Sequence, residues 1–361
     1  MLRMSDTKTE SVKTATALVR VLIVDDSAFI RKTVAQILSR SPFIQIVGIA
    51  GDGEEALEKV KELQPDVVTL DLMMPRMDGL EFLKRQMALS PLPIVVVSTA
   101  SGQHEMVLKA LEAGAVDFVH KPSQLATPSI FEITEELIEK VRTAATISLH
   151  RAELKRCPTP PDPAPEPNRG TGSVDAIVIG ISTGGPQGLK YLIPMLAETF
   201  PAPIAVVLHM PVGYTEMFAD KLNSLSKLNV MEAKEGDVMR KGVVLIAPGG
   251  RHLTFRREAD NSVCVHLDLQ PFQTLHRPSV DVLFGSAAEI FGARTLGIVM
   301  TGMGSDGLLG STCIKAHGGR IFTEAEETCV VYGMPSAVVE AGFSDRSVRL
   351  DMLAKAMMEV V

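Results

Sequence analysis

The sequence lacks the features that mark several large classes of protein. It has no tryptophan, and aromatic residues make up only 4% of its 361 residues. Its four cysteines include no Cys-x-x-Cys pair, which argues against a zinc site or disulfide framework and predicts reduced thiols in a cytoplasmic protein. No apolar run is as long as a membrane-spanning helix, and the net charge of −7 argues against nucleic acid as the main partner.

A proline-rich stretch near the middle of the chain predicts the boundary between two domains. Residues 158–167 read Pro-Thr-Pro-Pro-Asp-Pro-Ala-Pro-Glu-Pro, and no packed helix or strand accommodates so many prolines. The chain is long enough, at 361 residues, to form two packed cores. We expect a disordered extension over 1–18, a first domain over 19–138, a linker helix and Pro-rich linker over 139–172, and a second domain over 173–361.

In the first half, short apolar runs alternate with segments of helical periodicity. This alternation predicts an α/β domain with a doubly wound parallel sheet. The expected helices include 28–40, 53–63 and, after the last strand, 131–155. The expected strands are 19–24, 44–50, 67–70, 94–97 and 116–119.

Polar side chains follow these strands. If the strand order is 2-1-3-4-5, Asp25, Asp26 and Asp71 converge on one edge of the sheet. Crowded carboxylates repel one another, so the group favours a hard cation with oxygen ligands, and Mg²⁺ fits. Ser98 and Lys121 end adjacent strands and could hold the oxygens of a phosphoryl group on Asp71. The alternative is that each aspartate only caps a helix or turn.

This pattern resembles the receiver domain of two-component systems over about residues 19–125. The most specific match is Asp-Leu-Met-Met-Pro-Arg-Met-Asp-Gly at 71–79. The resemblance implies that Asp71 accepts a phosphoryl group from a chemotaxis sensor histidine kinase. It also implies an Mg²⁺ site made by Asp25, Asp26, Asp71 and the backbone carbonyl of Met73. The implied switch residues are Ser98, Lys121 and Phe118, of which Phe118 could equally be plain core.

The second half predicts another doubly wound, Rossmann-like α/β domain, with three chemically versatile side chains at strand ends. Strand 176–181 ends at Ser182, and Pro186 opens a helical pattern. A serine at that junction is either an anion binder or a nucleophile with backbone N–H groups nearby. His209 and Asp306 follow the strands 204–208 and 295–300, so the three residues could form a hydrolytic triad.

Other interpretations of these residues remain open at this point. The glycine-rich loop at 180–185 could cradle a phosphate, although the sequence has no Gly-x-Gly-x-x-Gly and no P-loop lysine. The pattern Gly-x-Ser-x-Gly at 180–184 fits a nucleophile elbow, but the chain order Ser, His, Asp differs from that of α/β-hydrolases. Rival candidates for the base and the carboxylate are His252, His276 and Asp281.

Several segments after about residue 175 together resemble the catalytic domain of the chemotaxis protein-glutamate methylesterases. They include Ile-Gly-Ile-Ser-Thr-Gly-Gly-Pro at 179–186, His-Met-Pro at 209–211 and Thr-Gly-Met-Gly-Ser-Asp-Gly at 301–307. The resemblance implies hydrolysis of glutamate γ-methyl esters, and deamidation of glutamines, on chemoreceptor signalling helices. It implies Ser182, His209 and Asp306 as the triad, Met303 and Thr183 as oxyanion-binding residues, and no cofactor at the hydrolase site.

The combination of the two domains implies regulation. A receiver docked over the Ser182 cleft would block it, and phosphorylation of Asp71 would weaken that contact. The expected partners are the sensor kinase and the cytoplasmic chemoreceptor helices, without membrane insertion. Two alternatives differ in class: a non-enzymatic regulator whose second domain binds a nucleotide or a partner protein, and a receiver-coupled esterase for a small-molecule ester.

Overall fold

The structure, a computed structural model, describes residues 18–98, 104–121, 129–147 and 174–361, with side chains from residue 134 onward in the third range. The Pro-rich segment and residues 1–17 of the expected extension lie outside this part. Two separate parallel sheets are present, which confirms the α/β class with two doubly wound domains. None of the helices in the described ranges is long and apolar enough to cross a membrane.

The N-terminal domain is a five-stranded parallel sheet in the order β2-β1-β3-β4-β5, as expected. Strand β1 pairs with both β2 and β3, so the loops that follow β1 and β3 lie side by side. The strands are β1 (Val19–Val24), β2 (Ile44–Ala50), β3 (Val67–Leu70), β4 (Ile94–Ser98) and β5 (Asp117–His120). The helices are α1 (Ala28–Leu38), α2 (Gly53–Leu63), α3 (Gly79–Leu89), α4 (His104–Glu112) and α5 (Ser129–Thr146).

Side-chain caps set the starts of the helices that follow the strands. The Asp52 carboxylate accepts hydrogen bonds from the N–H groups of Glu54 and Glu55 at the start of α2. Asp78 accepts from the N–H of Glu81 in the same way and begins α3. Gly79 must be small, because a Cβ there would lie 2.8 Å from Leu72 Cα. These caps fix the loop that follows Asp71.

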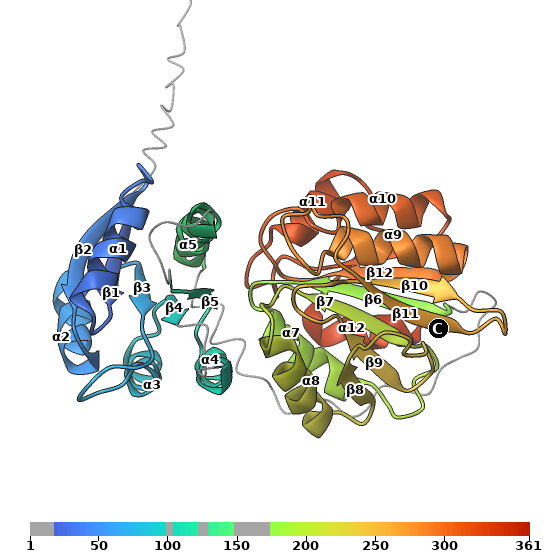
Figure 1. Ribbon diagram of the computed structural model, residues 1–361, viewed down its shortest axis with the longest axis horizontal. Coiled ribbons are helices and arrows are strands. Elements are labelled where there is room, and N and C mark those ends of the chain that lie inside the picture. Colours follow the sequence, from blue (N-terminus) through green and yellow to red (C-terminus); the bar gives the residue numbers. More distant parts are fainter. Residues whose placement is uncertain (1–17, 99–103, 122–128, 148–173) are drawn as a thin grey trace, which may run out of the picture.

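The C-terminal domain is a seven-stranded parallel sheet in the order β14-β13-β12-β6-β7-β9-β8. Helices cover both faces: α7, α8 and α12 lie on one face, and α9, α10 and α11 on the other (Figure 1). The strands are β6 (Ala176–Ile181), β7 (Ile204–Leu208), β8 (Asn229–Glu232), β9 (Val243–Ile246), β12 (Thr295–Val299), β13 (Arg320–Glu324) and β14 (Arg346–Val348). The α-helices are α7 (Gly185–Leu192), α8 (Tyr214–Leu225), α9 (Val280–Phe291), α10 (Leu308–Ala316), α11 (Met334–Glu340) and α12 (Leu350–Met358).

Shorter elements complete this domain. A two-stranded antiparallel hairpin, β10 (His252–Arg257) and β11 (Val263–Asp268), packs against α9. Two 3₁₀ turns, η1 (Ile193–Met195) and η2 (Gly292–Arg294), follow α7 and α9. Because β6 pairs with β7 on one side and with β12 on the other, the strand order reverses beside β6. In doubly wound sheets this is where sites form, at the carboxyl ends of the strands.

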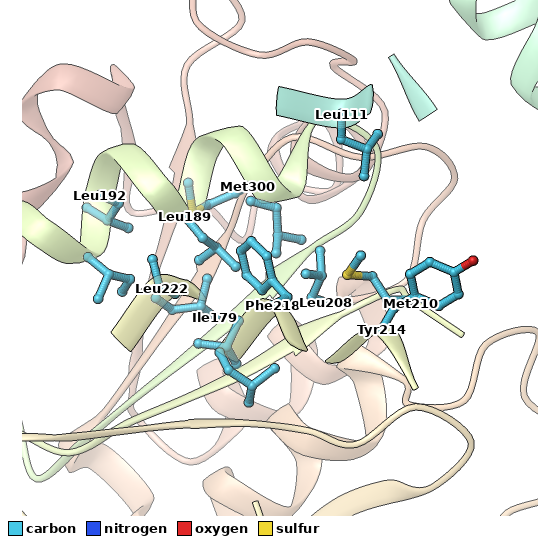
Figure 2. Packing of buried hydrophobic residues seen from close by; sticks show 14 of the residues in the cluster. Leu111, Ile179, Leu189, Leu192, Leu208, Met210, Tyr214, Phe218, Leu222 and Met300 are labelled. Carbon is cyan, nitrogen blue, oxygen red and sulfur yellow. The ribbon is translucent and has the colours of Figure 1, made fainter. Parts of the chain in front are cut away.

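The two domains contact each other directly. Helix α4 and strand β5 of the N-terminal domain face the C-terminal domain (Figure 1), and α4 packs against α7 and α8. Leu111 of α4 belongs to the same buried cluster as Leu189 of α7 and Phe218 of α8 (Figure 2). The domain boundary expected at 138–139 lies inside α5, which packs on α1 and β5.

Candidate active site

Ser182, His209 and Asp306 lie at the carboxyl edge of three adjacent strands. Ile181 and Leu208 are paired in the sheet, and Ser182 and His209 are the residues that follow them. The His209 N–H donates to the Ile181 carbonyl at 3.2 Å, and the Ser182 N–H donates to the Thr301 carbonyl at 3.0 Å. Asp306 comes from the loop after β12, the strand on the other side of β6. Three segments far apart in sequence therefore meet at one edge.

The imidazole of His209 is held by Asp306. Its Nε2 lies 2.8 Å from Asp306 Oδ2, and both side chains are largely buried. An ionised carboxylate can only accept, so Nε2 carries the proton and Nδ1 is left as the acceptor. Nδ1 is buried and has no hydrogen-bond partner among the described residues. No hydrogen bond between Ser182 Oγ and His209 is formed in the described residues, so Nδ1 is free to take a proton.

Asp306 is fixed by the start of α9 as well as by the imidazole. It accepts hydrogen bonds from the N–H groups of Val280 and Asp281 at 2.8 and 2.9 Å, and from the Ser279 hydroxyl at 2.9 Å. Burial alone would raise the pKa of Asp306, but the hydrogen bond and the charge of His209, together with the helix N–H groups, lower it below its usual range. The carboxylate is therefore kept ionised opposite the histidine.

The rival carboxylate has a different place. Asp281 accepts hydrogen bonds from Gly307 N–H at 2.8 Å and Gly310 N–H at 2.7 Å, so it caps the start of α10. Burial, and then the nearby charge of Asp306, raise the pKa of Asp281 to about 6. Asp306 thus caps α9, and Asp281 caps α10. Of the two carboxylates, it is Asp306 that accepts the hydrogen bond from His209.

The two other histidines considered from the sequence flank the site. The ring of His276 stacks on that of His209, with centroids 4.0 Å apart and planes inclined by 26°. Desolvation, and then the nearby His209, lower the pKa of His276 to about 4, so it is neutral at pH 7. His252 is fully buried and accepts a hydrogen bond from the Ser279 N–H at 3.2 Å, which anchors the loop that carries His276. Sequence reasoning missed the stacking, since nothing in the spacing of these residues signals it.

Backbone N–H groups are available beside Ser182. Among the described residues, neither the Met303 N–H nor the Thr183 N–H donates to another group. The loop that carries Met303 lies close to the serine. A Cβ added at Gly302 would lie only 2.9 Å from Ser182 Cβ. Ser182 itself does not have the positive φ of a strained nucleophile elbow, so the Gly-x-Ser-x-Gly match does not extend to that geometry.

In the N-terminal domain, Asp25, Asp26 and Asp71 place carboxylate oxygens within 4.8 Å of one another. Lys121 Nζ bridges two of them, at 2.8 Å from Asp25 and 2.7 Å from Asp71. Burial raises the pKa of Asp71, although the hydrogen bond and the charge of Lys121 oppose the shift. This donor set fits Mg²⁺, with the Met73 carbonyl two residues after Asp71 as a further oxygen.

The remaining expected residues surround this acidic trio or face the other domain. Ser98 is fully buried at the end of β4, and its carbonyl accepts from the Lys121 N–H at 2.7 Å. Phe118 is buried in the core of its own domain and also reaches the other domain. Its ring lies 4.8 Å from that of Tyr214 on α8, so a residue of β5 contacts the second domain directly.

The N-terminal domain also reaches residues beside Ser182. The Thr183 hydroxyl donates to the Asp117 carboxylate across the two domains. Thr143 of α5 places its hydroxyl 2.8 Å from the Met303 sulfur. Gln187 of α7 donates to the Leu111 carbonyl at 2.6 Å. The contacts thus lie on both loops that flank the serine.

Comparisons with known proteins agree with this architecture. Residues 177–357 match the family model described as CheB methylesterase, and residues 21–128 match that of the response regulator receiver domain. The chain is 47% identical over 349 residues to protein-glutamate methylesterase/protein-glutamine glutaminase 5 of Myxococcus xanthus, covering 94% of this chain and 98% of the relative. A Halalkalibacterium halodurans protein of the same name is 43% identical, covering 94% and 97%. The CheB methylesterase catalytic domain of Thermotoga maritima superposes with a TM-score of 0.51 and 42% identity, over 52% of this chain and all of that one.

Proposed function

The chain belongs to the CheB methylesterase family, and we propose that it hydrolyses glutamate γ-methyl esters on chemoreceptor signalling helices under the control of its receiver domain. The observation that carries the proposal is the His209–Asp306 hydrogen bond beside Ser182 at the carboxyl edge of the sheet. Such a set can remove a proton from a serine and return it to a leaving group. The family match supports the substrate class.

The first step uses the free nitrogen of His209. Nδ1 takes the proton of Ser182 Oγ as this oxygen attacks the ester carbonyl carbon, giving a tetrahedral intermediate. Asp306 keeps the proton on Nε2 and stabilises the imidazolium that forms. Because the ring of His276 is neutral at pH 7, it covers one face of this imidazole without adding positive charge.

The intermediate needs hydrogen-bond donors for its negative oxygen. The N–H groups of Met303 and Thr183 are unused by the described residues and lie on the two loops next to Ser182. We assign the oxyanion to these donors. Collapse of the intermediate breaks the carbon–oxygen bond of the ester, and the proton on Nδ1 passes to the departing methanol.

Hydrolysis of the acyl-enzyme repeats the cycle with water. His209 takes a proton from water, the hydroxide attacks the acyl carbon, and Ser182 leaves with a proton from the histidine. A glutamine side chain follows the same path with ammonia as the leaving group. Both reactions therefore yield a glutamate carboxylate on the substrate protein.

The receiver domain would suppress this reaction when unphosphorylated. Its residues Asp117 and Thr143 contact Thr183 and Met303, the two residues assigned to the oxyanion. Phosphorylation of Asp71 by a sensor histidine kinase would reposition Ser98 and Phe118, and Phe118 packs on Tyr214 of the catalytic domain. Phe118 would thereby carry the change at the phosphorylation site to the interface between the domains.

Asp25, Asp26, Asp71 and the Met73 carbonyl would hold Mg²⁺, which supplies charge neutralisation for the incoming phosphoryl group. Lys121, already bonded to Asp71, would bind an oxygen of the phosphorylated side chain. The hydrolase site requires no cofactor in this proposal. The substrate, the cytoplasmic part of a receptor, would place the enzyme in the cytoplasm.

The test is methanol release from a methyl-esterified chemoreceptor fragment, with the chain kept phosphorylated by a small donor and Mg²⁺. Replacing Ser182 by alanine should lower the rate by roughly 10⁶-fold, as loss of a triad nucleophile does in serine proteases. Ser305→Ala is the matched control, since Ser305 is exposed in the loop next to Asp306 and has no assigned role. Near-normal release by Ser182→Ala would overturn the assignment.

A further inference from the structure

Three exposed apolar side chains belong to the two chain segments that carry His209 and His276. Leu275 is 97% exposed, Val212 69% and Phe272 61%. Leu275 directly precedes His276, and Val212 lies three residues after His209. Single exposed apolar residues are ordinary, so their meaning depends on whether they form one surface.

Contacts through Gly250 and Arg277 link Val212 to Phe272, and Leu275 lies in the same chain segment as Phe272 and Arg277. A Cβ at Gly250 would lie 2.8 Å from Val212 Cγ2, so Val212 covers this glycine. The Gly250 N–H donates to the Arg277 carbonyl at 2.9 Å. The Arg277 guanidinium lies 5.4 Å from the centre of the Phe272 ring and donates to the Phe272 carbonyl. We call Val212, Phe272, Leu275 and Arg277 the cleft rim.

The cleft rim also carries uncompensated positive charge. Arg277 Nε is buried and has no hydrogen-bond partner within the described ranges. Neither Arg277 nor the exposed Arg251 beside Gly250 forms an ion pair with any residue that the structure describes. A buried donor without an acceptor costs free energy, which a ligand with an acidic oxygen would recover.

We propose that the cleft rim is the docking surface for the substrate helix, an amphipathic segment with glutamate carboxylates around the esterified residue. The inference rests on the proposed function. Every completed turnover leaves a carboxylate on the substrate, so a partly processed segment is acidic and matches Arg277 and Arg251. The apolar face of the helix would cover Leu275 and Phe272, and its esterified side chain would reach past His276 to Ser182.

The position of the receiver agrees with this arrangement. Its hydrogen bonds reach Thr183, Gln187 and Met303, while its aromatic rings pack on Tyr214 and His104 lies beside Gly213. None of its described residues makes a hydrogen bond or an ion pair with a member of the cleft rim. The receiver's hydrogen bonds and ion pairs, within the described ranges, thus leave the polar groups of the rim to the substrate helix. The rim gives affinity for the helix, and the receiver controls access to the serine.

The decisive variant is Leu275→Ser in the full chain, phosphorylated with a small donor and Mg²⁺. Because Leu275 is almost fully exposed, the change should leave folding intact. Loss of one buried leucine contact is expected to raise KM for the methyl-esterified receptor fragment by about tenfold. Turnover of p-nitrophenyl acetate, too small to touch the rim, should stay within about twofold of wild type. Arg277→Gln should also raise KM for the fragment.

Leu89→Ser is the matched control, since Leu89 is 77% exposed on α3 of the receiver. An unchanged KM in Leu275→Ser, equal to that of Leu89→Ser, would overturn the inference. Equal losses of activity on both substrates would also overturn it, because they would indicate damage to the site. A change in oligomeric state would overturn it as well, because it would indicate that a second copy of the chain occupies the rim.

A binding experiment separates this inference from the proposed function. If wild type releases no methanol from the fragment, the proposed function fails. The affinity of the Ser182→Ala chain for the same fragment then still decides the inference. Binding that becomes about tenfold weaker when Leu275→Ser is added to Ser182→Ala supports the rim as the docking surface. No binding at all, or no change in affinity, contradicts it.

Discussion

The hydroxyl of Thr183 donates a hydrogen bond to the carboxylate of Asp117, and this bond joins the residue next to Ser182 to β5 of the receiver. Asp117 is also paired with Lys140 of α5 at 3.0 Å, and Lys140 bonds the Phe118 carbonyl at 2.7 Å. This contact thus links the loop that contains Ser182 to β5, the strand that carries Phe118 of the receiver.

Replacing Asp117 by alanine should activate the unphosphorylated chain. The substitution removes a buried, charge-assisted hydrogen bond that stabilises the contact between the domains. Loss of this stabilisation should expose the site more often and raise basal methanol release by roughly tenfold. The phosphorylated rate should remain that of wild type, because Asp117 has no role in the reaction. Glu136→Ala is the control, since Glu136 pairs with the same Lys140 at 2.9 Å. An Asp117→Ala chain with wild-type basal activity would refute the inhibitory role of this contact.

Replacing Asp71 by asparagine should abolish activation by a small phosphoryl donor. Only a carboxylate can form the acyl phosphate, and the carboxylate of Asp71 is buried in the acidic trio, where it bonds Lys121 through Oδ2. We expect the donor and Mg²⁺ to leave the methanol-release rate of this variant unchanged. The same substitution at Asp78, which caps α3, should leave activation intact. Full activation of Asp71→Asn would place the phosphoryl group elsewhere.

The role of Asp306 predicts a large effect of a small change. Asp306→Asn keeps the size of the side chain but allows the wrong tautomer of His209, and a loss of roughly 10⁴-fold in kcat is expected. Asp281→Asn tests the rival carboxylate and should keep kcat within a few-fold of wild type. If the two variants lost activity equally, Asp306 could not be assigned as the carboxylate of the triad.

Asp281 also predicts a pH effect on stability. Its pKa is raised from the ordinary 3.8 to about 6, so the folded chain binds more protons than the unfolded chain between these values. The free energy of unfolding contributed by this group therefore falls as pH rises through that window. Asp281→Asn removes this fall, so its Tm relative to wild type should be higher at pH 8 than at pH 5. Thermal unfolding at both pH values measures this, with Asp220→Asn on the surface of α8 as the control.

A Tm difference between Asp281→Asn and wild type that is the same at pH 5 and pH 8 would mean that the carboxyl titrates normally in the folded chain. A difference that falls with pH would require a lowered pKa. Either result would contradict the burial of Asp281 against Asp306.

The buried strands were predictable because both faces of a parallel sheet need apolar residues. The runs 67–70 and 204–208 coincide with β3 and β7 for this reason, and every residue of both strands is buried. Strands β8 and β13 were not predicted: they begin with Asn229 and Arg320, and the sheet recruits them by pairing with stronger neighbours.

The site was predictable only in part. Strand ends pointed to Ser182, His209 and Asp306, with Asp281 as a rival carboxylate. Both aspartates lie at helix starts, and only the fold decides which one reaches the imidazole. The stacking of His276 and the contact of Phe118 with Tyr214 depend on tertiary packing between segments far apart in sequence. Such contacts have no local periodicity from which they could be inferred.

The central claim is that Ser182 performs the hydrolysis and that the receiver controls access to it. The most direct measurement is the rate of methanol release from one methyl-esterified receptor fragment by the full chain, before and after addition of a small phosphoryl donor with Mg²⁺. An allosteric coupling of the usual size between phosphorylation and the hydrolase site predicts that the donor raises this rate by about 5- to 150-fold. The rise should be absent in Ser182→Ala. Equal rates with and without the donor would contradict the account.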